Sequence, residues 1–171
     1  QPGFIPNRAV SITVGENVRM NVRMVDCVGY LIDGAQGHTE DGGARMVMTP
    51  WSESAMPFEQ AADIGTKKVI AEHSTSGIVM TTDGSIADIP RSAYVPAEER
   101  VVAELTELNK PFVILLNCMD AQSDEAYALA EELQKKYSAT VIPINAMSFS
   151  EQDIADIMSD LLYEFPIKQI K

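Results

Sequence analysis

The chain has 171 residues, of which 46% are apolar, so it is long enough for one domain of ordinary size with a buried core. Its formal charge of −12 would repel the phosphates of nucleic acids and anionic lipids, so we expect neither as a direct partner. No apolar run approaches the roughly 20 residues of a membrane-spanning helix, and the amino end lacks the pattern of a secretory signal, so we expect a soluble, cytosolic protein.

The first predicted elements are the two strands of an antiparallel hairpin. Residues 9–14 alternate between apolar and polar, residues 15–17 supply a tight turn, and residues 18–24 alternate again. Because alternation places every second side chain on one face, we expect a hairpin with one packed face. On the second strand that face carries Val18, Met20, Val22 and Met24.

Three short, nearly continuous apolar runs predict strands of a different kind. They cover residues 77–80, 112–116 and 140–144. Unbroken apolar sequence is typical of parallel strands that are covered on both faces. Pro143 has no backbone N–H to donate, so we expect the last of these strands at an edge of the sheet.

Segments with helical periodicity alternate with these strands. We expect helices over about residues 58–73, from Pro96 to Asn109, and behind the N-cap residues Ser123 and Ser150. The last three helices have apolar stripes formed by Val101, Val102, Leu105 and Leu108; by Ala126, Leu129, Ala130, Leu133 and Tyr137; and by Ile154, Ile157, Met158, Leu161 and Leu162. The alternation predicts an α/β fold with a mostly parallel sheet, right-handed crossovers and an antiparallel N-terminal hairpin.

Residues 31–57 do not fit this alternation. Glycines and acidic residues are frequent there, followed by Trp51 and two prolines. We expect a long mobile loop, and a loop of this length in a compact domain is usually either functional or disordered.

The two cysteines, Cys27 and Cys118, each lie in or at the end of an apolar run. Reduced, buried thiols are commoner in such places than disulfides or metal ligands. We therefore expect both thiols to be buried.

Asp26 follows the second hairpin strand and precedes Gly29 by three residues. A carboxylate at a strand end can hold the water shell of Mg²⁺, and a glycine lets its backbone N–H approach a terminal phosphate. This is the D-x-x-G spacing of GTPase-like nucleotide hydrolases. Taken alone, the same pair is more typical of a turn that Asp26 caps and in which Gly29 takes a positive φ.

Asn117 and Asp120 have the spacing of the base-binding motif N-K-x-D, with Cys118 in place of the lysine. In that motif the asparagine steadies the loop and the carboxylate accepts hydrogen bonds from the base. A capped turn between strand and helix is an equally good interpretation of this pair. Asn145 and Ala146, after the last strand, resemble the small-residue loop that packs against the base.

The order of these motifs along the chain is more specific than any one of them. It is the order of a translation-factor-related P-loop nucleotide hydrolase. Asp83 lies between the motifs and is either an outer ligand of Mg²⁺ or a residue that forms a turn. We favour the turn. The phosphate-binding loop G-x-x-x-x-G-K-[ST] is absent from the sequence. By comparison with that fold, the central first strand is absent as well and would lie between the hairpin and the strand at residues 77–82.

Several longer segments carry a closer likeness: residues 22–30, 49–51, 57–58, 62–70, 72–75, 81–86, 97–101 and 162–166. In these segments the sequence closely resembles the stage IV sporulation protein A family of endospore-forming bacteria. The resemblance covers nearly the whole chain.

The resemblance implies a P-loop-like, three-layer ATPase domain over residues 1–165, without its first strand and P-loop, and the start of a following region at residues 166–171. It implies ATP and Mg²⁺ as cofactors, with these 171 residues inactive on their own. In this interpretation Asp26 binds the metal and acts in catalysis together with Gly29. The nucleotide-binding residues would be Asn117, Asp120, Asn145 and Ala146.

The family resemblance also implies a biological role. Members use ATP hydrolysis to self-assemble in the mother cell, on the forespore surface, as the base layer of the spore coat. A membrane peptide, stage V sporulation protein M, anchors that layer, so the membrane would be reached only through a partner and through regions outside this chain.

Two alternatives remain from the residues themselves. The chain can be a non-catalytic scaffold module, in which the sheet only supports assembly contacts. A receiver-like or flavodoxin-like domain is disfavoured, because such a fold does not begin with an antiparallel hairpin.

Overall fold

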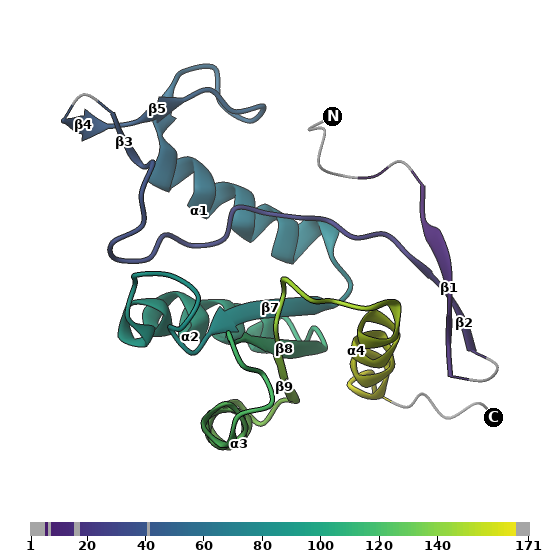
Figure 1. Cartoon of the computed structure of the whole chain (residues 1–171). Coiled ribbons are helices and arrows are strands. Elements are labelled where there is room, and N and C mark those ends of the chain that lie inside the picture. The colour runs from purple at the N-terminus through teal and green to yellow at the C-terminus, as the bar shows by residue number, and fades with distance from the viewer. Residues whose placement is uncertain (1–5, 7, 16–17, 41, 167–171) are drawn as a thin grey trace.

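A computed structural model describes residues 6, 8–15, 18–40 and 42–166. At its centre lies a parallel sheet of three strands, β7 (Gly77–Thr82), β8 (Phe112–Asn117) and β9 (Val141–Ile144), in that order (Figure 1). All three strands and their parallel direction were predicted and are confirmed. Pro143 lies in the edge strand β9, as its missing N–H requires.

The middle strand β8 explains why its sequence is apolar at every position. Its side chains alternate between two separate cores, and residues 112–116 are all buried. Ile114 and Leu116 belong to a core formed with α2 (Arg91–Glu107) and α3 (Asp124–Tyr137). Val113 and Leu115 belong to a core formed with α4 (Glu151–Tyr163) and the N-terminal hairpin. Helices therefore cover both faces of the sheet.

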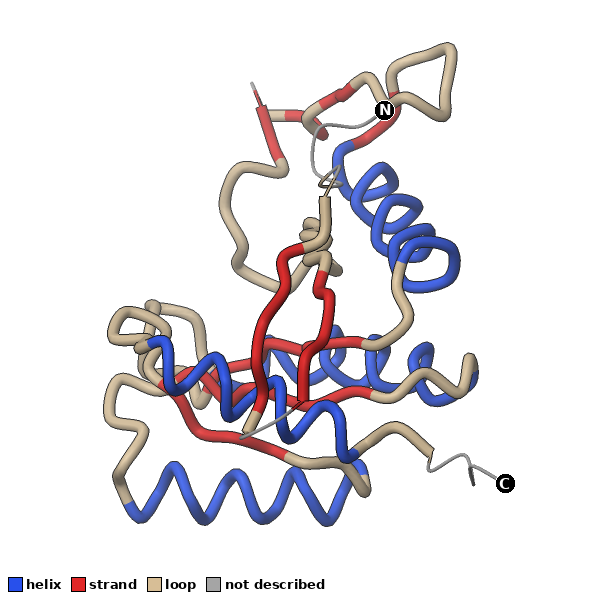
Figure 2. The backbone as a smooth tube through the Cα atoms, turned by 90° about the vertical axis from the view of Figure 1, so that its right-hand side faces the viewer, coloured by secondary structure: helices blue, strands red, loops and turns tan. Residues whose placement is uncertain are grey.

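The N-terminal hairpin consists of β1 (Val10–Val14) and β2 (Val18–Val22), paired antiparallel as predicted. It forms a two-stranded sheet of its own, and Figure 2 shows its strands running across the direction of the central sheet. Val14 is buried against the core of α4, and Met20 packs there in part. Val18 and Met24 are 52% and 62% exposed, so the predicted packed face is only partly covered.

The predicted caps of α3 and α4 are confirmed. The Ser123 hydroxyl accepts a hydrogen bond from the Ala126 N–H, and Ser150 forms a capping box with Asp153. The apolar stripes face inward with two exceptions. Ile154 is 47% exposed, because the core that buries Ile157 does not reach the first turn of α4. Leu108 is 45% exposed, because it is the residue that caps the end of α2.

The start of α2 was predicted wrongly. The helix begins at Arg91, behind the N-cap residue Pro90, and Pro96 lies inside it. A proline within the second turn removes one backbone hydrogen bond, that to the carbonyl four residues earlier. The extra turn brings Arg91 onto the same face as Glu98, seven residues later, where the two side chains form a largely buried ion pair.

Residues 31–57 contain short paired strands, where a single long loop was predicted. β3 (Thr39–Glu40) pairs with β4 (Gly43–Ala44), and β5 (Met46–Val47) pairs with β6 (Met56–Pro57), both antiparallel. Two-residue strands leave no detectable alternation in a sequence, so their pairing could not be predicted from it.

The helix predicted over residues 58–73 is present as α1 (Phe58–Lys68), which continues as a π-helical segment, η1 (Val69–His73). The ammonium group of Lys110 holds the end of η1: it donates to the carbonyl oxygens of Ile70, of Ala71 at 2.9 Å and of Ser74 at 2.7 Å. The turn before β8 is thereby fastened to η1. Of the region predicted after the ATPase domain, residues 167–171 lie outside the described residues.

Candidate functional site

The carboxyl ends of β8 and β9 meet beside a polar pocket of about 280 Å³. In parallel sheets this edge is the usual place for a ligand. The pocket is lined by Met119, Asp120, Ala121, Gln122, Pro143, Ile144, Asn145, Ser148, Phe149 and Asp153. Two of the four residues predicted to bind the nucleotide, Asp120 and Asn145, are therefore in its wall.

The other two predicted residues hold the pocket together from behind. The side-chain oxygen of Asn117, the last residue of β8, accepts a hydrogen bond of 3.0 Å from the backbone N–H of Ala146. The side-chain amide of Asn145 in turn donates to the Met119 carbonyl at 2.9 Å. These two bonds cross between the loops after β8 and β9 in opposite directions, so the loops are held at a fixed separation. The structure thus brings together all four residues predicted for the base.

The loop after β7 is tied to the same edge. One carboxylate oxygen of Asp83 accepts from the Ser85 N–H at 2.8 Å and from its hydroxyl at 2.6 Å, which is the turn that we favoured for this residue. Burial would raise the pKa of Asp83, but the hydrogen bonds from Ser85 outweigh it and the pKa is lowered. The Ser85 hydroxyl also accepts from the Met119 N–H at 2.8 Å, which joins this turn to the pocket loop. Gly84 has φ +92°, and a Cβ at this position would lie 2.9 Å from the backbone nitrogen of Arg91.

The thiol of Cys118, at the carboxyl end of β8, is buried and stays protonated. It donates to the Leu116 carbonyl at 3.3 Å, and burial, followed by the negative charge of Asp83, raises its pKa to about 12. Cys27, in contrast, is exposed, so its predicted burial is wrong. The reason is that regular strand structure ends at Val22, which leaves Cys27 in irregular chain outside the core.

The two thiols should differ sharply in reactivity. We expect iodoacetamide to alkylate Cys27 in the folded protein at least about 100-fold faster than Cys118, because only the thiolate reacts and Cys118 is both inaccessible and neutral. Mass spectrometry of peptides after timed alkylation measures both rates in one sample. Equal rates in the folded protein would contradict the burial of Cys118, and equal rates in denaturant are the control.

Asp26 does not line the pocket of Asp120 and Asn145. It lies in exposed chain after β2 and lines a larger, mainly apolar cleft of about 530 Å³, together with Cys27 and Val28. Gly29 has φ +80°, the positive value expected for the turn after Asp26. The opposite walls of the cleft are formed by residues 47–51, α1 and η1. The metal-binding and base-binding predictions thus fall on two separate hollows.

A magnesium ion beside Asp26 would take most of its ligands from groups other than protein side chains. In the described part of the chain, no group of three or more His, Cys, Asp or Glu side chains is placed to hold a metal. Mg²⁺ bound to a nucleotide needs only one or two protein carboxylates, because phosphates and water supply its remaining ligands. The single exposed carboxylate of Asp26 meets that requirement.

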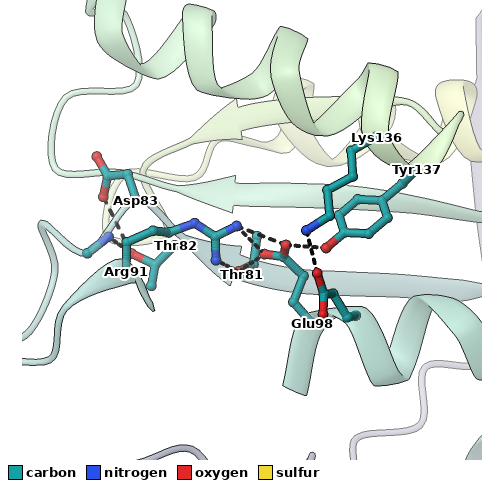
Figure 3. Close-up of polar contacts among 9 residues, drawn as sticks. Thr81, Thr82, Asp83, Arg91, Glu98, Lys136 and Tyr137 are labelled. Carbon is teal, nitrogen blue, oxygen red and sulfur yellow. Dashed lines mark hydrogen bonds and ion pairs between the residues drawn. The ribbon is translucent and has the colours of Figure 1, made fainter. Parts of the chain in front are cut away.

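Sequence reasoning missed a buried polar cluster beneath the end of β7. The Glu98 carboxylate accepts from the hydroxyls of Thr81 at 2.5 Å and Tyr137 at 2.6 Å, and Arg91 lies 2.7 Å and 2.8 Å from its two oxygens (Figure 3). On the helix surface beside it, Lys136 pairs with Glu99 at 2.6 Å. The cluster joins β7, α2 and α3. Its only trace in the sequence is the seven-residue spacing of Arg91 and Glu98.

The fold is α/β, with a polar pocket at the carboxyl end of its parallel sheet, the edge at which proteins of this class bind ligands. Residues 1–166 match the family described as "Stage IV sporulation protein A, ATPase domain". The chain belongs to this family, as the resemblance in its sequence predicted. No solved structure matches it significantly.

Curated relatives agree with this assignment. Three of them are named stage IV sporulation protein A. The chain is 50% identical to the protein of Clostridioides difficile (strain 630), over 100% of the chain. It is 45% identical to that of Bacillus subtilis (strain 168) and 46% identical to that of Bacillus anthracis, in both cases over 99% of the chain. The chain spans about 35% of the length of each relative. Among the residues that the structure describes, no helix has both the length and the hydropathy to cross a bilayer.

Proposed function

We propose that the chain is part of an ATP-hydrolysing protein that self-assembles in the mother cell, on the forespore surface, as the base layer of the spore coat. The observation that carries the enzymatic part is the polar pocket between the β8 and β9 loops, in a chain of an ATPase-domain family. Its volume of about 280 Å³ is at the lower end of the roughly 300–1,000 Å³ of whole-ligand sites, which suits one part of a nucleotide, the base.

In this proposal the two hollows serve opposite ends of ATP. Asp120 and Asn145 contact the base, and Asn117 and Ala146 keep their loops in place. Asp26 holds Mg²⁺, and the Gly29 N–H meets the terminal phosphate. Catalysis then depends on positioning and on neutralising phosphate charge.

We further propose that a strand and the P-loop, from a part of the protein outside these residues, complete a three-layer domain between the hairpin and β7. Three features support this. Within the described residues β7 pairs only with β8, so its outer edge is open, and the hairpin forms a separate sheet. Three residues that line the cleft beside Asp26, namely Thr49, Trp51 and Thr66, each carry a buried side-chain polar atom without a hydrogen-bond partner. A backbone passing through the cleft would supply such partners.

The partners belong to the same proposal. The protein binds further copies of itself, and regions outside this chain contact the membrane peptide stage V sporulation protein M and other coat proteins. It contacts the membrane only through that partner, and its negative charge argues against nucleic acid.

One observation favours the non-catalytic alternative, a scaffold module for protein assembly. Asp26 and the predicted base pocket line different hollows, and nothing but a nucleotide would connect them. In a scaffold, the two hollows would serve assembly contacts alone.

Asp26→Ala in the full-length protein distinguishes the two functions. We expect ATP turnover to fall by at least about 100-fold, because the metal that neutralises phosphate charge loses its protein ligand. Phosphate release at saturating ATP and Mg²⁺ measures the effect. Asp156→Ala, which removes an exposed acid of α4 far along the chain, should leave turnover unchanged. Undiminished turnover in Asp26→Ala would eliminate the proposed catalytic site.

A further inference from the structure

Tyr30, the residue after Gly29, is held by two side chains of α2, those of Glu104 and Arg100. Its hydroxyl donates a short hydrogen bond to Glu104 of α2. The guanidinium of Arg100, one helical turn earlier on α2, stacks on the Tyr30 ring at 3.6 Å from the ring centre. Both the polar and the apolar part of Tyr30 are therefore in contact with α2.

Arg100 also connects Tyr30 to α1. It forms a two-pronged pair with Asp63 of α1, with nitrogen–oxygen distances of 2.9 Å and 2.7 Å, and lies 3.4 Å from Glu104. Bidentate pairs of this kind fix orientation better than a single contact does. Arg100 thus links α1, α2 and the chain at Tyr30 through one planar group.

The chain on either side of this cluster has no comparable support. Residues 23–32 contain neither helix nor strand. Figure 1 shows this segment running from β2 across α1 in the view, toward β3. Asp26, Cys27 and Val28 before it are exposed. The position of Gly29 is therefore set mainly by its neighbour Tyr30.

The phenol of Tyr30 stays protonated within the clamp. Burial and the bond to Glu104 raise the pKa of the phenol, so the hydroxyl remains a donor to the carboxylate throughout the physiological range. The bond to Asp63 raises the pKa of Arg100 above its ordinary value. Charge-assisted contacts of this type are stronger than neutral ones.

We propose that Tyr30 is a positioning residue for ATP hydrolysis: clamped by Arg100 and Glu104, it holds Gly29 at the place where the terminal phosphate is met. The inference rests on the proposed function.

The test is steady-state ATP hydrolysis by the full-length protein with substitutions in the clamp. We expect Tyr30→Ala to lower kcat about 10- to 100-fold with KM for ATP changed less than about threefold, because a misplaced Gly29 is felt in the transition state and base contacts remain. Tyr30→Phe keeps the ring under Arg100 but loses the bond to Glu104, so kcat should fall less than in Tyr30→Ala, by about threefold to fivefold. Arg100→Lys keeps the charge but loses the planar fork, and should lower kcat about fivefold or more.

Tyr137→Phe is the matched control. It removes another tyrosine hydroxyl bound to a carboxylate of α2, that of Glu98, in a place remote from Gly29 along the chain. We expect its kcat to stay within about twofold of the native value. If Tyr30→Ala does not fold, Tyr30→Phe and Arg100→Lys still test the positioning role. If Arg100 positions Tyr30, Arg100→Lys must lower kcat more than Tyr30→Phe does.

The outcomes separate this inference from the proposed function. Undiminished turnover in Asp26→Ala removes the catalytic site and the positioning role with it. A large effect of Asp26→Ala with native kcat in Tyr30→Ala and Arg100→Lys overturns the positioning role alone. An equal loss in Tyr137→Phe, or a rise in KM at native kcat, also overturns it, because general destabilisation or simple binding would then explain the data.

Discussion

Glu98→Gln is expected to lower the free energy of unfolding by about 3 kcal/mol at neutral pH, because it breaks a buried ion pair and leaves Arg91 without its partner. The Glu98 side chain is only 1% exposed and that of Arg91 19%. The substituted amide would offer one oxygen to three donors and turn an N–H group toward a cation. Urea unfolding of the native and variant proteins measures the difference.

The pH dependence of this effect has a definite sign. Burial would raise the pKa of Glu98, but hydrogen bonds from Arg91, Thr81 and Tyr137 lower it below the ordinary 4.5. A carboxyl whose pKa is lowered by folding stabilises the protein above its unfolded pKa and loses that contribution as the pH falls through its folded pKa. The difference between the native protein and Glu98→Gln should therefore be full at pH 7 and shrink below about pH 4.5.

The neighbouring residue provides a matched control. Glu99→Gln removes an equally short pair with Lys136, but both side chains are at least 40% exposed. Exposed pairs contribute about 0–1 kcal/mol, so this variant should unfold nearly as the native protein does. Equal destabilisation by the two substitutions, or a gap for Glu98→Gln that is constant down to acid pH, would contradict the structure.

Leu116→Ala should be at least as damaging, with a loss of about 3–5 kcal/mol in the free energy of unfolding. Leu116 is fully buried in the middle strand, in the core that α2 and α3 form over the sheet. A cavity in the middle strand of a sheet closes poorly, because both neighbouring strands hold the backbone of that strand in place. Chemical unfolding measures the loss.

Leu108→Ala is the control for this substitution. Leu108 caps α2 and is 45% exposed, so its truncation should cost less than about 1 kcal/mol. A similar loss for both leucines would indicate that Leu116 is not in a closed core. Secondary structure by circular dichroism should be unchanged in both variants under native conditions.

The regular part of the fold could be predicted because its signals are local. Residues 112–116 are apolar at every position, which identifies a doubly covered strand, and Ser123 and Ser150 mark helix starts through hydrogen bonds that span three residues. The start of α2 could not be predicted in this way. There, the local rule about Pro96 does not hold, and Arg91 in the added turn pairs with Glu98, whose other partners lie on β7 and α3.

The candidate site also contains residues whose placement could be predicted from the sequence and residues whose placement could not. Asn117, Asp120, Asn145 and Ala146 were expected together, because parallel strands end at one edge of a sheet. The path of the chain after Val22 was not predictable, since it follows no period. That path exposes Cys27, opens a second hollow beside Asp26 and places Tyr30 under Arg100.

The sequence by itself determined the family, the parallel strands with their crossover helices, and the polar residues at the strand ends. Each of these depends on residue type and on spacing within a few turns or strands. Only the tertiary structure decided which polar groups are buried and which hydrogen-bond partners they have. Glu98 bonds to Tyr137, Tyr30 bonds to Glu104, and Lys110 bonds to the end of η1. These contacts join residues 36 to 74 positions apart, and burial, which gives them their strength, is a property of the packed chain and not of any segment.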